Sequence, residues 1–88
     1  MNSKHIGNKV LYDTNVSVKA RLLMLFLLEV SNEEGEDYLD ISISFLCKAL
    51  GYSNKTIIKA INELEENGYI EKTRRGLGKN NLYKIIRG

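Results

Sequence analysis

Residues 46–60, LCKALGYSNKTIIKA, decide the fold of this chain of 88 residues. Gly51 follows a short apolar segment and suits the left-handed backbone conformation that ends many helices. Ser53 comes two residues later and is a preferred N-cap, so a new helix is expected to begin there. The stretch therefore predicts two short helices separated by a sharp turn, which is the helix-turn-helix arrangement.

The limits of these two helices follow from their capping residues. The first helix is expected from Ile43 to Leu50, with Ser42 as its N-cap. The second is expected from Ser53 to about Asn67, closed by Gly68. Serine favours the first position of a helix and glycine the position after its end, so both boundaries are predicted from local signals.

The second helix of the pair has one apolar and one polar face. Ile57, Ile61 and Leu64 recur at the i, i+4, i+7 spacing of a buried face. On a polar face, asparagine pairs bidentately with adenine, lysine reaches guanine or phosphate, and hydroxyls donate to phosphate. An ordinary exposed helix is also polar, but the short turn and the local cations favour DNA. The expected DNA-binding residues of this recognition helix are Ser53, Asn54, Lys55, Thr56 and Lys59.

Residues 74–81, RRGLGKNN, join two expected strands, Tyr69 to about Arg74 and Leu82 to Ile86. Glycines permit the positive φ angles of a hairpin turn and let the backbone approach a ligand closely. The cations are expected to reach backbone phosphates or a narrow minor groove, as in the wing of a winged helix-turn-helix. The alternative is a charged hairpin that only keeps the chain soluble. The expected DNA-binding residues of the wing are Arg74, Arg75, Gly76, Gly78, Lys79 and Asn80.

The N-terminal part of the chain has a weaker pattern. Residues 1–16 lack a clear period and are expected to form an N-terminal arm, or a short strand around residues 10–12. Ser17 is a plausible N-cap, and a helix is expected from Val18 to about Val30. The domain proper is therefore predicted to span residues 17–88.

The order of the expected elements gives the fold class. Polar residues 31–36 end the first helix, and Tyr38–Ile41 alternates apolar with polar residues like a short strand. The order is then helix, strand, helix, helix, strand, strand. It predicts an α+β fold, a winged helix-turn-helix of three helices with a small β-sheet that includes a C-terminal β-hairpin wing.

Charge is distributed unevenly along the chain. The formal net charge is +2, but residues 1–51 carry a balance of −2 and residues 52–88 a balance of +4. A basic end on an otherwise neutral domain is typical of proteins that bind a polyanion. The acids in residues 63–66, ELEE, lie at the far end of the recognition helix and are interpreted as a solvated face that stays away from the phosphates.

The first helix predicts a subunit interface. Residues 22–28, LLMLFLL, are apolar on every side, whereas a surface helix needs only one apolar stripe. The excess is expected to be covered by the N-terminal arm, by a second subunit, or by both, and a homodimer is favoured because the arm is short. The residues expected at the dimer interface are Leu22, Met24, Phe26 and Leu27.

The sequence does not indicate a membrane protein, a metal-binding protein or an enzyme. Residues 22–28 form the longest apolar run, which is too short to span a membrane. The lone Cys47 is expected to be a small buried filler in a cytoplasmic, reducing setting. One histidine and one cysteine far apart offer no metal site, and no catalytic arrangement or cofactor motif stands out. We therefore expect no enzyme activity, no catalytic residues, no metal and no cofactor.

Four stretches carry a family resemblance. They are VSVKARLL at 16–23, LCKALGYS at 46–53, AINELEENGYIE at 60–71, and RGLGK at 75–79 before Tyr83. From Asn15 to Ile85 the chain resembles the winged-helix DNA-binding domains of replication proteins from plasmids and phages of Gram-positive bacteria. The RGLGK stretch is especially similar to the wing of the plasmid replication initiator A family.

The resemblance implies a function. A small winged-helix protein of a plasmid or other mobile element would bind specific double-stranded DNA, most simply in replication initiation, with a replication or transfer protein as a possible partner. The family's long C-terminal region and longer lead-in are not part of this sequence, which favours a free-standing binder. An accessory protein at a conjugative transfer origin and a small transcriptional repressor are the alternatives, and a protein-interaction winged helix is the third.

Overall fold

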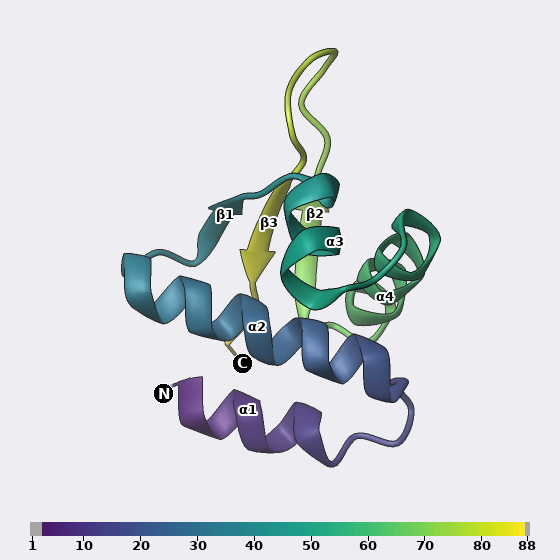
Figure 1. Cartoon of the computed structure of the whole chain (residues 1–88). Coiled ribbons are helices and arrows are strands. Elements are labelled where there is room, and N and C mark those ends of the chain that lie inside the picture. The colour runs from purple at the N-terminus through teal and green to yellow at the C-terminus, as the bar shows by residue number, and fades with distance from the viewer. Residues whose placement is uncertain (1–2, 88) are drawn as a thin grey trace.

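The structure is a computed structural model that describes residues 3–87, with side chains described from Ile6 to Arg87 (Figure 1). Over this range the chain forms four helices and three strands. In order they are α1 (Ser3–Leu11), α2 (Val18–Glu34), β1 (Tyr38–Asp40), α3 (Ile43–Leu50), α4 (Asn54–Glu66), β2 (Ile70–Thr73) and β3 (Leu82–Ile85).

The three strands form one antiparallel sheet in the order β1-β3-β2. Tyr83 in the central strand is paired with Leu39 on one side and Lys72 on the other. Leu39 and Tyr83 are buried, as are Ile70 and Ile85, which pair at the end of the hairpin. Half-buried and buried residues alternate along β3, which shows that one face of the sheet covers the core. The α+β winged helix-turn-helix predicted from the sequence is confirmed.

The helix-turn-helix forms where its capping residues predict it. The Ser42 hydroxyl accepts a hydrogen bond from the Phe45 amide at 3.0 Å at the start of α3. Gly51 then ends α3 with a φ of 71°, and its amide donates to the Cys47 carbonyl at 2.8 Å. The Ser53 hydroxyl accepts from the Thr56 amide at 3.2 Å and begins α4. These contacts are local, so the sequence alone sufficed to place both helices.

Helix α2 is longer than the sequence predicted. It continues through the polar residues after Val30 and ends at Glu34, followed by Gly35 with a φ of 66°. The Gly35 amide donates to the Ser31 carbonyl, which closes the last turn. Ser31 itself is buried. Glutamate is a good helix former, so the polarity of this segment did not end the helix, and the left-handed glycine did.

The N-terminal segment is a helix, and the expectation of a short strand around residues 10–12 is wrong. Ile6 and Val10 lie four positions apart in α1 and are both buried. They belong to the same hydrophobic core as α2. Figure 1 shows α1 lying alongside α2, on the side opposite α3, α4 and the sheet. The i, i+4 pair can be buried only because α2 offers it a second apolar face.

Two residues expected at a subunit interface are inside the chain's own core. Met24 and Leu27 are almost fully buried, which contradicts their expected outward position. Helix α1 covers one side of α2, and α4 packs against another, so most of the apolar surface of α2 is used within one chain. Leu22 remains 47% exposed and Phe26 is partly buried.

Candidate nucleic-acid interface

The exposed face of α4 carries most of the recognition residues expected from the sequence. Asn54, Lys55 and Lys59 are exposed, whereas Thr56 is half-buried. Ile58 lies on the same face and is 50% exposed. The opposite face is buried against the rest of the domain through Ile57, Ala60, Ile61 and Leu64. The helix is therefore fixed by one side and presents a mixed cationic, amide and apolar surface on the other.

The first turn of α4 is held by side chains. The Ser53 hydroxyl accepts from the Thr56 amide and donates to the Thr56 Oγ1 at 3.0 Å. The Asn54 Oδ1 accepts from the Cys47 Sγ at 3.0 Å, which ties α4 to α3. Cys47 is half-buried, so its interpretation as a purely buried filler is wrong: its thiol orients the Asn54 amide group. This leaves the Asn54 NH2 group as the part suited to an adenine edge.

Glu63 does not lie on a merely solvated face, as the sequence suggested. Its Oε1 accepts from the Ser17 amide at 2.8 Å, and its Oε2 accepts from the Ser17 hydroxyl at 3.0 Å. The Ser17 hydroxyl in turn accepts from the Ala20 amide as the N-cap of α2. A carboxylate at a helix N-terminus is favoured by the unpaired amides and by the helix dipole. Glu63 therefore fixes how α4 sits against the start of α2.

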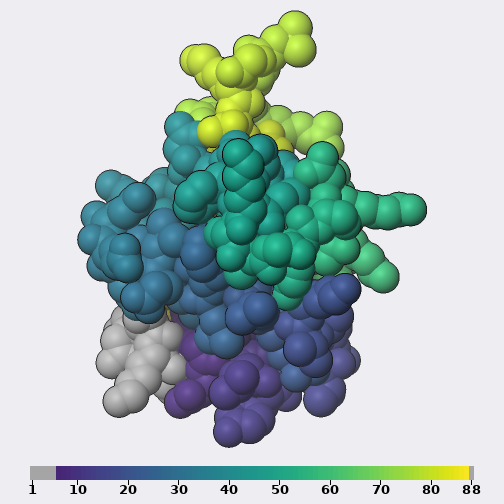
Figure 2. All heavy atoms as spheres, viewed as in Figure 1, coloured from purple at the N-terminus to yellow at the C-terminus, as the bar shows by residue number. Residues whose placement is uncertain are grey.

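The wing extends beyond the body of the domain (Figures 1 and 2). Gly76 and Gly78 have φ values of 66° and 78°, and the Lys79 amide lies 3.4 Å from the Gly76 carbonyl. Both glycines are needed because a residue with a Cβ is strained at these angles. The turn leaves Arg74, Leu77 and Lys79 exposed.

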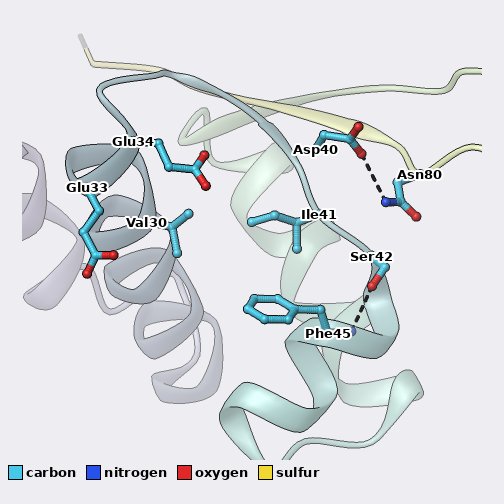
Figure 3. A pocket seen from close by; sticks show the side chains of 8 residues that line it. All are labelled: Val30, Glu33, Glu34, Asp40, Ile41, Ser42, Phe45 and Asn80. Atoms are coloured by element: carbon cyan, nitrogen blue, oxygen red, sulfur yellow. Dashed lines mark hydrogen bonds between the residues drawn. The ribbon is translucent and has the colours of Figure 1, made fainter.

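The base of the wing is braced by three polar side chains. Arg75 forms an ion pair with Asp40 at the end of β1, with 2.8 Å between Nη2 and Oδ1, and its Nε donates to the Asn80 carbonyl at 2.9 Å. The Asn80 Nδ2 donates to the same Asp40 Oδ1 at 3.1 Å (Figure 3). Arg75 foremost, and Asn80 after it, hold the pKa of the Asp40 carboxyl below its usual range. Two residues expected to contact DNA are thus engaged within the fold.

Asp40 is the part of this site that the sequence reasoning missed. It lies 35 and 40 positions before its two partners, and only the pairing of β1 with β3 brings it to the wing. The sequence contained one indication of this contact. Asp40 lies near the end of the predicted strand 38–41, and an acid beside a cationic hairpin tends to pair with one of its cations.

The remaining cations of the site have no acidic partner among the side chains that the structure describes. In that range the ion pairs are Arg75 with Asp40 and Arg87 with Asp37. Four cations of α4 and the wing are exposed and take part in neither: Lys55, Lys59, Arg74 and Lys79. Unpaired surface cations keep their full charge for a polyanion.

The described part of the chain has neither a helix suited to cross a membrane nor a group of side chains suited to hold a metal ion. Between residues 3 and 87, no helix is both long and apolar enough to cross a membrane. Among the side chains from Ile6 to Arg87, Cys, Asp and Glu do not gather in a group of three that would hold a metal ion.

The comparisons with known proteins agree with this geometry. A family model described as "Helix-turn-helix domain" matches residues 14–70, from the loop before α2 to the first residue of β2. Among solved structures, the chain is similar to one titled "N-Terminal domain of DNA binding protein". The TM-score is 0.73 and the identity 23%, over 90% of this chain and 70% of that chain. At this identity the similarity shows the fold. The search of curated proteins gave no match.

Proposed function

The chain belongs to the helix-turn-helix domain family, and from this premise we propose that it binds specific double-stranded DNA through α4 and the wing. The observation that carries the proposal is a set of four exposed cations on these two elements that pair with no acid among the described side chains: Lys55, Lys59, Arg74 and Lys79. Helix α4 and the wing both lie on the side of α2 away from α1 (Figure 1).

The two elements are proposed to act differently. The N-terminal turn of α4 offers the amide of Asn54 and the ammonium groups of Lys55 and Lys59 to base edges in a major groove. The wing offers Arg74 and Lys79 to phosphates or to a narrow minor groove beside it. We expect no catalytic activity, because binding and positioning are all that this arrangement of side chains supports.

The salt dependence of DNA binding tests the proposal. If four cations each neutralise about one phosphate, log K should fall against log salt with a slope of about −3.6 per subunit, measured by fluorescence anisotropy. Lys9 is the matched control, because it is an exposed cation on α1, where it lies 5.4 Å from the Tyr69 ring centroid. Lys9→Ala should leave the slope unchanged. Absence of binding at low salt, or a slope near zero, contradicts DNA binding and favours a protein-interaction winged helix.

Replication initiation on a plasmid or another mobile element is the process we propose for this binding. It is supported by the resemblance of RGLGK at 75–79, and of the three stretches before it, to the initiator A family. Selection of bound sites from random DNA, followed by location of the selected site on the DNA that carries the gene, tests the proposal. Direct repeats of the kind found at replication origins support it, whereas a single palindrome overlapping a promoter favours the small repressor. Sites beside a nicking site favour the accessory role at a transfer origin.

A homodimer through one side of α2 and α3 is also proposed. Leu22 is 47% and Phe45 51% exposed, and the rings of Phe45 and Phe26 lie 6.2 Å apart between their centroids. Apolar residues gathered in this way mark interaction surfaces more often than single exposed ones do. Phe45 thus replaces Met24 and Leu27 in the interface expected from the sequence.

Sedimentation of the wild-type protein at tens of micromolar tests the dimer, and a monomer there contradicts it. Phe45→Glu should yield monomers. Tyr12→Glu is the control, because Tyr12 is highly exposed but lies in the loop between α1 and α2.

A further inference from the structure

The tip of the wing carries an apolar side chain that contacts little of the fold. Leu77 is 103% exposed relative to its reference value, and the next most exposed large apolar residue, Tyr12, reaches 78%. Burial in the core therefore cannot account for leucine here. A single exposed leucine is not unusual by itself, so its surroundings decide whether it has a role.

The surroundings make the tip narrow. Gly76 and Gly78 flank Leu77, and a Cβ placed on either glycine would meet nothing within 4 Å. The space beside Leu77 is therefore open on both sides, and its side chain is the only bulky group in the Gly-Leu-Gly tip. A tip of this kind suits the minor groove of B-DNA, which is only about 6 Å wide.

The stalk below the tip is supported by the sheet. Arg75 and Asn80 both bind Asp40, so the two arms of the hairpin are joined to β1 just before the turn. Figure 3 shows Asn80 meeting Asp40 at this point. A braced stalk can hold a side chain against a base step, whereas a free loop would fold away from it.

Cations stand on both sides of the apolar tip. Arg74 precedes Leu77 by three residues and Lys79 follows it by two, and both are exposed without an acidic partner among the described side chains. Phosphates of both strands line a minor groove, so one cation on each arm can engage one strand while the leucine points between them.

We propose that Leu77 is an apolar wedge that enters the minor groove, unstacks one base step and bends the DNA. The proposal rests on the DNA binding proposed above and adds an activity to it. Inserted leucine side chains kink duplexes by about 20–90° toward the major groove. Pyrimidine–purine steps unstack most easily, so we expect a TA or CA step under the wing.

Two measurements on the full chain test the wedge. Energy transfer between the ends of a duplex of about 30 base pairs reports bending. A 2-aminopurine placed at successive positions of the selected site reports unstacking. Wild type should raise the transfer and brighten the 2-aminopurine at one step. Leu77→Ser should abolish both effects while keeping the salt slope, because no charge is lost.

Three controls test whether a loss of bending is due to the apolar side chain of residue 77. Leu77→Met should preserve the bend, because methionine also serves as a wedge. Leu11→Ser is the matched control, since Leu11 is a partly exposed leucine on α1 and should leave bending unchanged. Leu77→Ser should unfold at the wild-type temperature, because its side chain is fully exposed.

The outcomes separate this inference from the proposed function. Wild type that binds the duplex without bending it, or Leu77→Ser that bends it as wild type does, overturns the wedge and leaves DNA binding intact. Wild type that fails to bind duplex DNA at low salt overturns both.

Discussion

Helix α4 and the wing carry similar numbers of polar and cationic residues, yet the structure uses them differently. On α4, Lys55 and Lys59 are exposed and engage no acid among the described side chains. In the wing, Arg75 and Asn80 are bound to Asp40, whereas Arg74 and Lys79 engage no acid among the described side chains. The difference teaches that a count of cations overestimates the charge available to a ligand, because some of them hold the binding element in place.

The two elements also differ in how they are anchored. Helix α4 buries a continuous apolar face through Ile57, Ile61 and Leu64. The loop of the wing, residues 74–81, has no buried residue and depends on polar contacts to β1. Burial of several large side chains stabilises an element far more than an exposed ion pair does. We therefore expect α4 to keep its place under conditions that release the wing.

The largest effect is expected on α4. Lys55→Ala or Lys59→Ala should lower the preference for the selected site over random DNA, since a lost base contact costs about 1–3 kcal/mol, or roughly 5- to 150-fold. Competition binding against random duplex measures this preference, with Lys9→Ala as control. The division of roles is reversed if these variants discriminate normally while wing variants lose specificity.

The next largest effect is expected for the contact between Arg75 and Asp40 at the base of the wing. Arg75→Ala should weaken DNA binding by releasing the wing, and Asp40→Asn should do the same although it removes a negative charge. The double variant should be no worse than either single one, because both act through one contact. Asp37→Asn is the control, since it also removes an acid that pairs with an arginine, Arg87. Tighter binding by Asp40→Asn contradicts the bracing role.

A smaller and more uniform effect is expected at the two exposed wing cations, Arg74 and Lys79. Arg74→Ala and Lys79→Ala should each reduce the steepness of the log K against log salt plot by about 0.9. Selected and random DNA should weaken by similar factors, because phosphate contacts carry no direct sequence information. If Arg74→Ala or Lys79→Ala changes the discrimination without changing the slope, that residue contacts a base instead of a phosphate.

Much of the fold was predictable because its signals are local. The caps Ser42 and Ser53 and the glycine at 51 lie within a few residues of the backbone groups that they serve, so α3 and α4 form where expected. Helix α1 was missed because Ile6 and Val10 form a buried pair only against a second face of α2. Three apolar residues in α1, of which Leu11 is exposed, do not by themselves predict such a partner.

The candidate site was predictable in its residues but not in their roles. Exposure of Lys55 and Lys59 follows from helical periodicity, which the sequence contains. The Arg75–Asp40 pair depends on which strand becomes the neighbour of β3, and the Glu63–Ser17 contact joins residues 46 positions apart. Long-range contacts of this kind produce no periodic pattern in the sequence. Glu63 was therefore interpreted as solvated, and Arg75 and Asn80 as residues that contact DNA.

The junction of α4 with α2 gives a test through stability. Ser17→Ala removes the N-cap of α2 and the hydroxyl that binds Glu63, and should lower the free energy of unfolding by about 1 kcal/mol. Urea unfolding measures it. Glu66→Gln is the control, because this acid is exposed and lies outside the contact. A loss for Glu66→Gln equal to that for Ser17→Ala would mean that general charge, and not the junction, stabilises α4.

The smallest effect concerns the anchorage of β2, which leads into the wing, and appears only at high pH. The Tyr69 hydroxyl donates to the Asp13 Oδ2 at 2.7 Å, which ties the loop after α1 to the residue before β2. Burial first, and this hydrogen bond second, raise the pKa of Tyr69 to about 12. Because the folded pKa lies above the unfolded value near 10, the stabilisation is fully present below pH 10 and is lost as the pH rises through 12.

Ultraviolet absorbance of tyrosinate during alkaline titration measures this directly. Tyr69→Phe should remove one step that occurs near pH 12, and Asp13→Asn should move that step to lower pH while burial keeps it above 10. Burial also raises the pKa of Tyr83. Tyr83→Phe therefore identifies which step of the titration belongs to this second buried tyrosine. At neutral pH neither Asp13→Asn nor Tyr69→Phe should alter the salt slope of DNA binding, because no DNA-facing cation changes. If Tyr69 ionises near pH 10 with the chain still folded, the loop is not tied to β2, and the support of the wing reduces to the Asp40 brace alone.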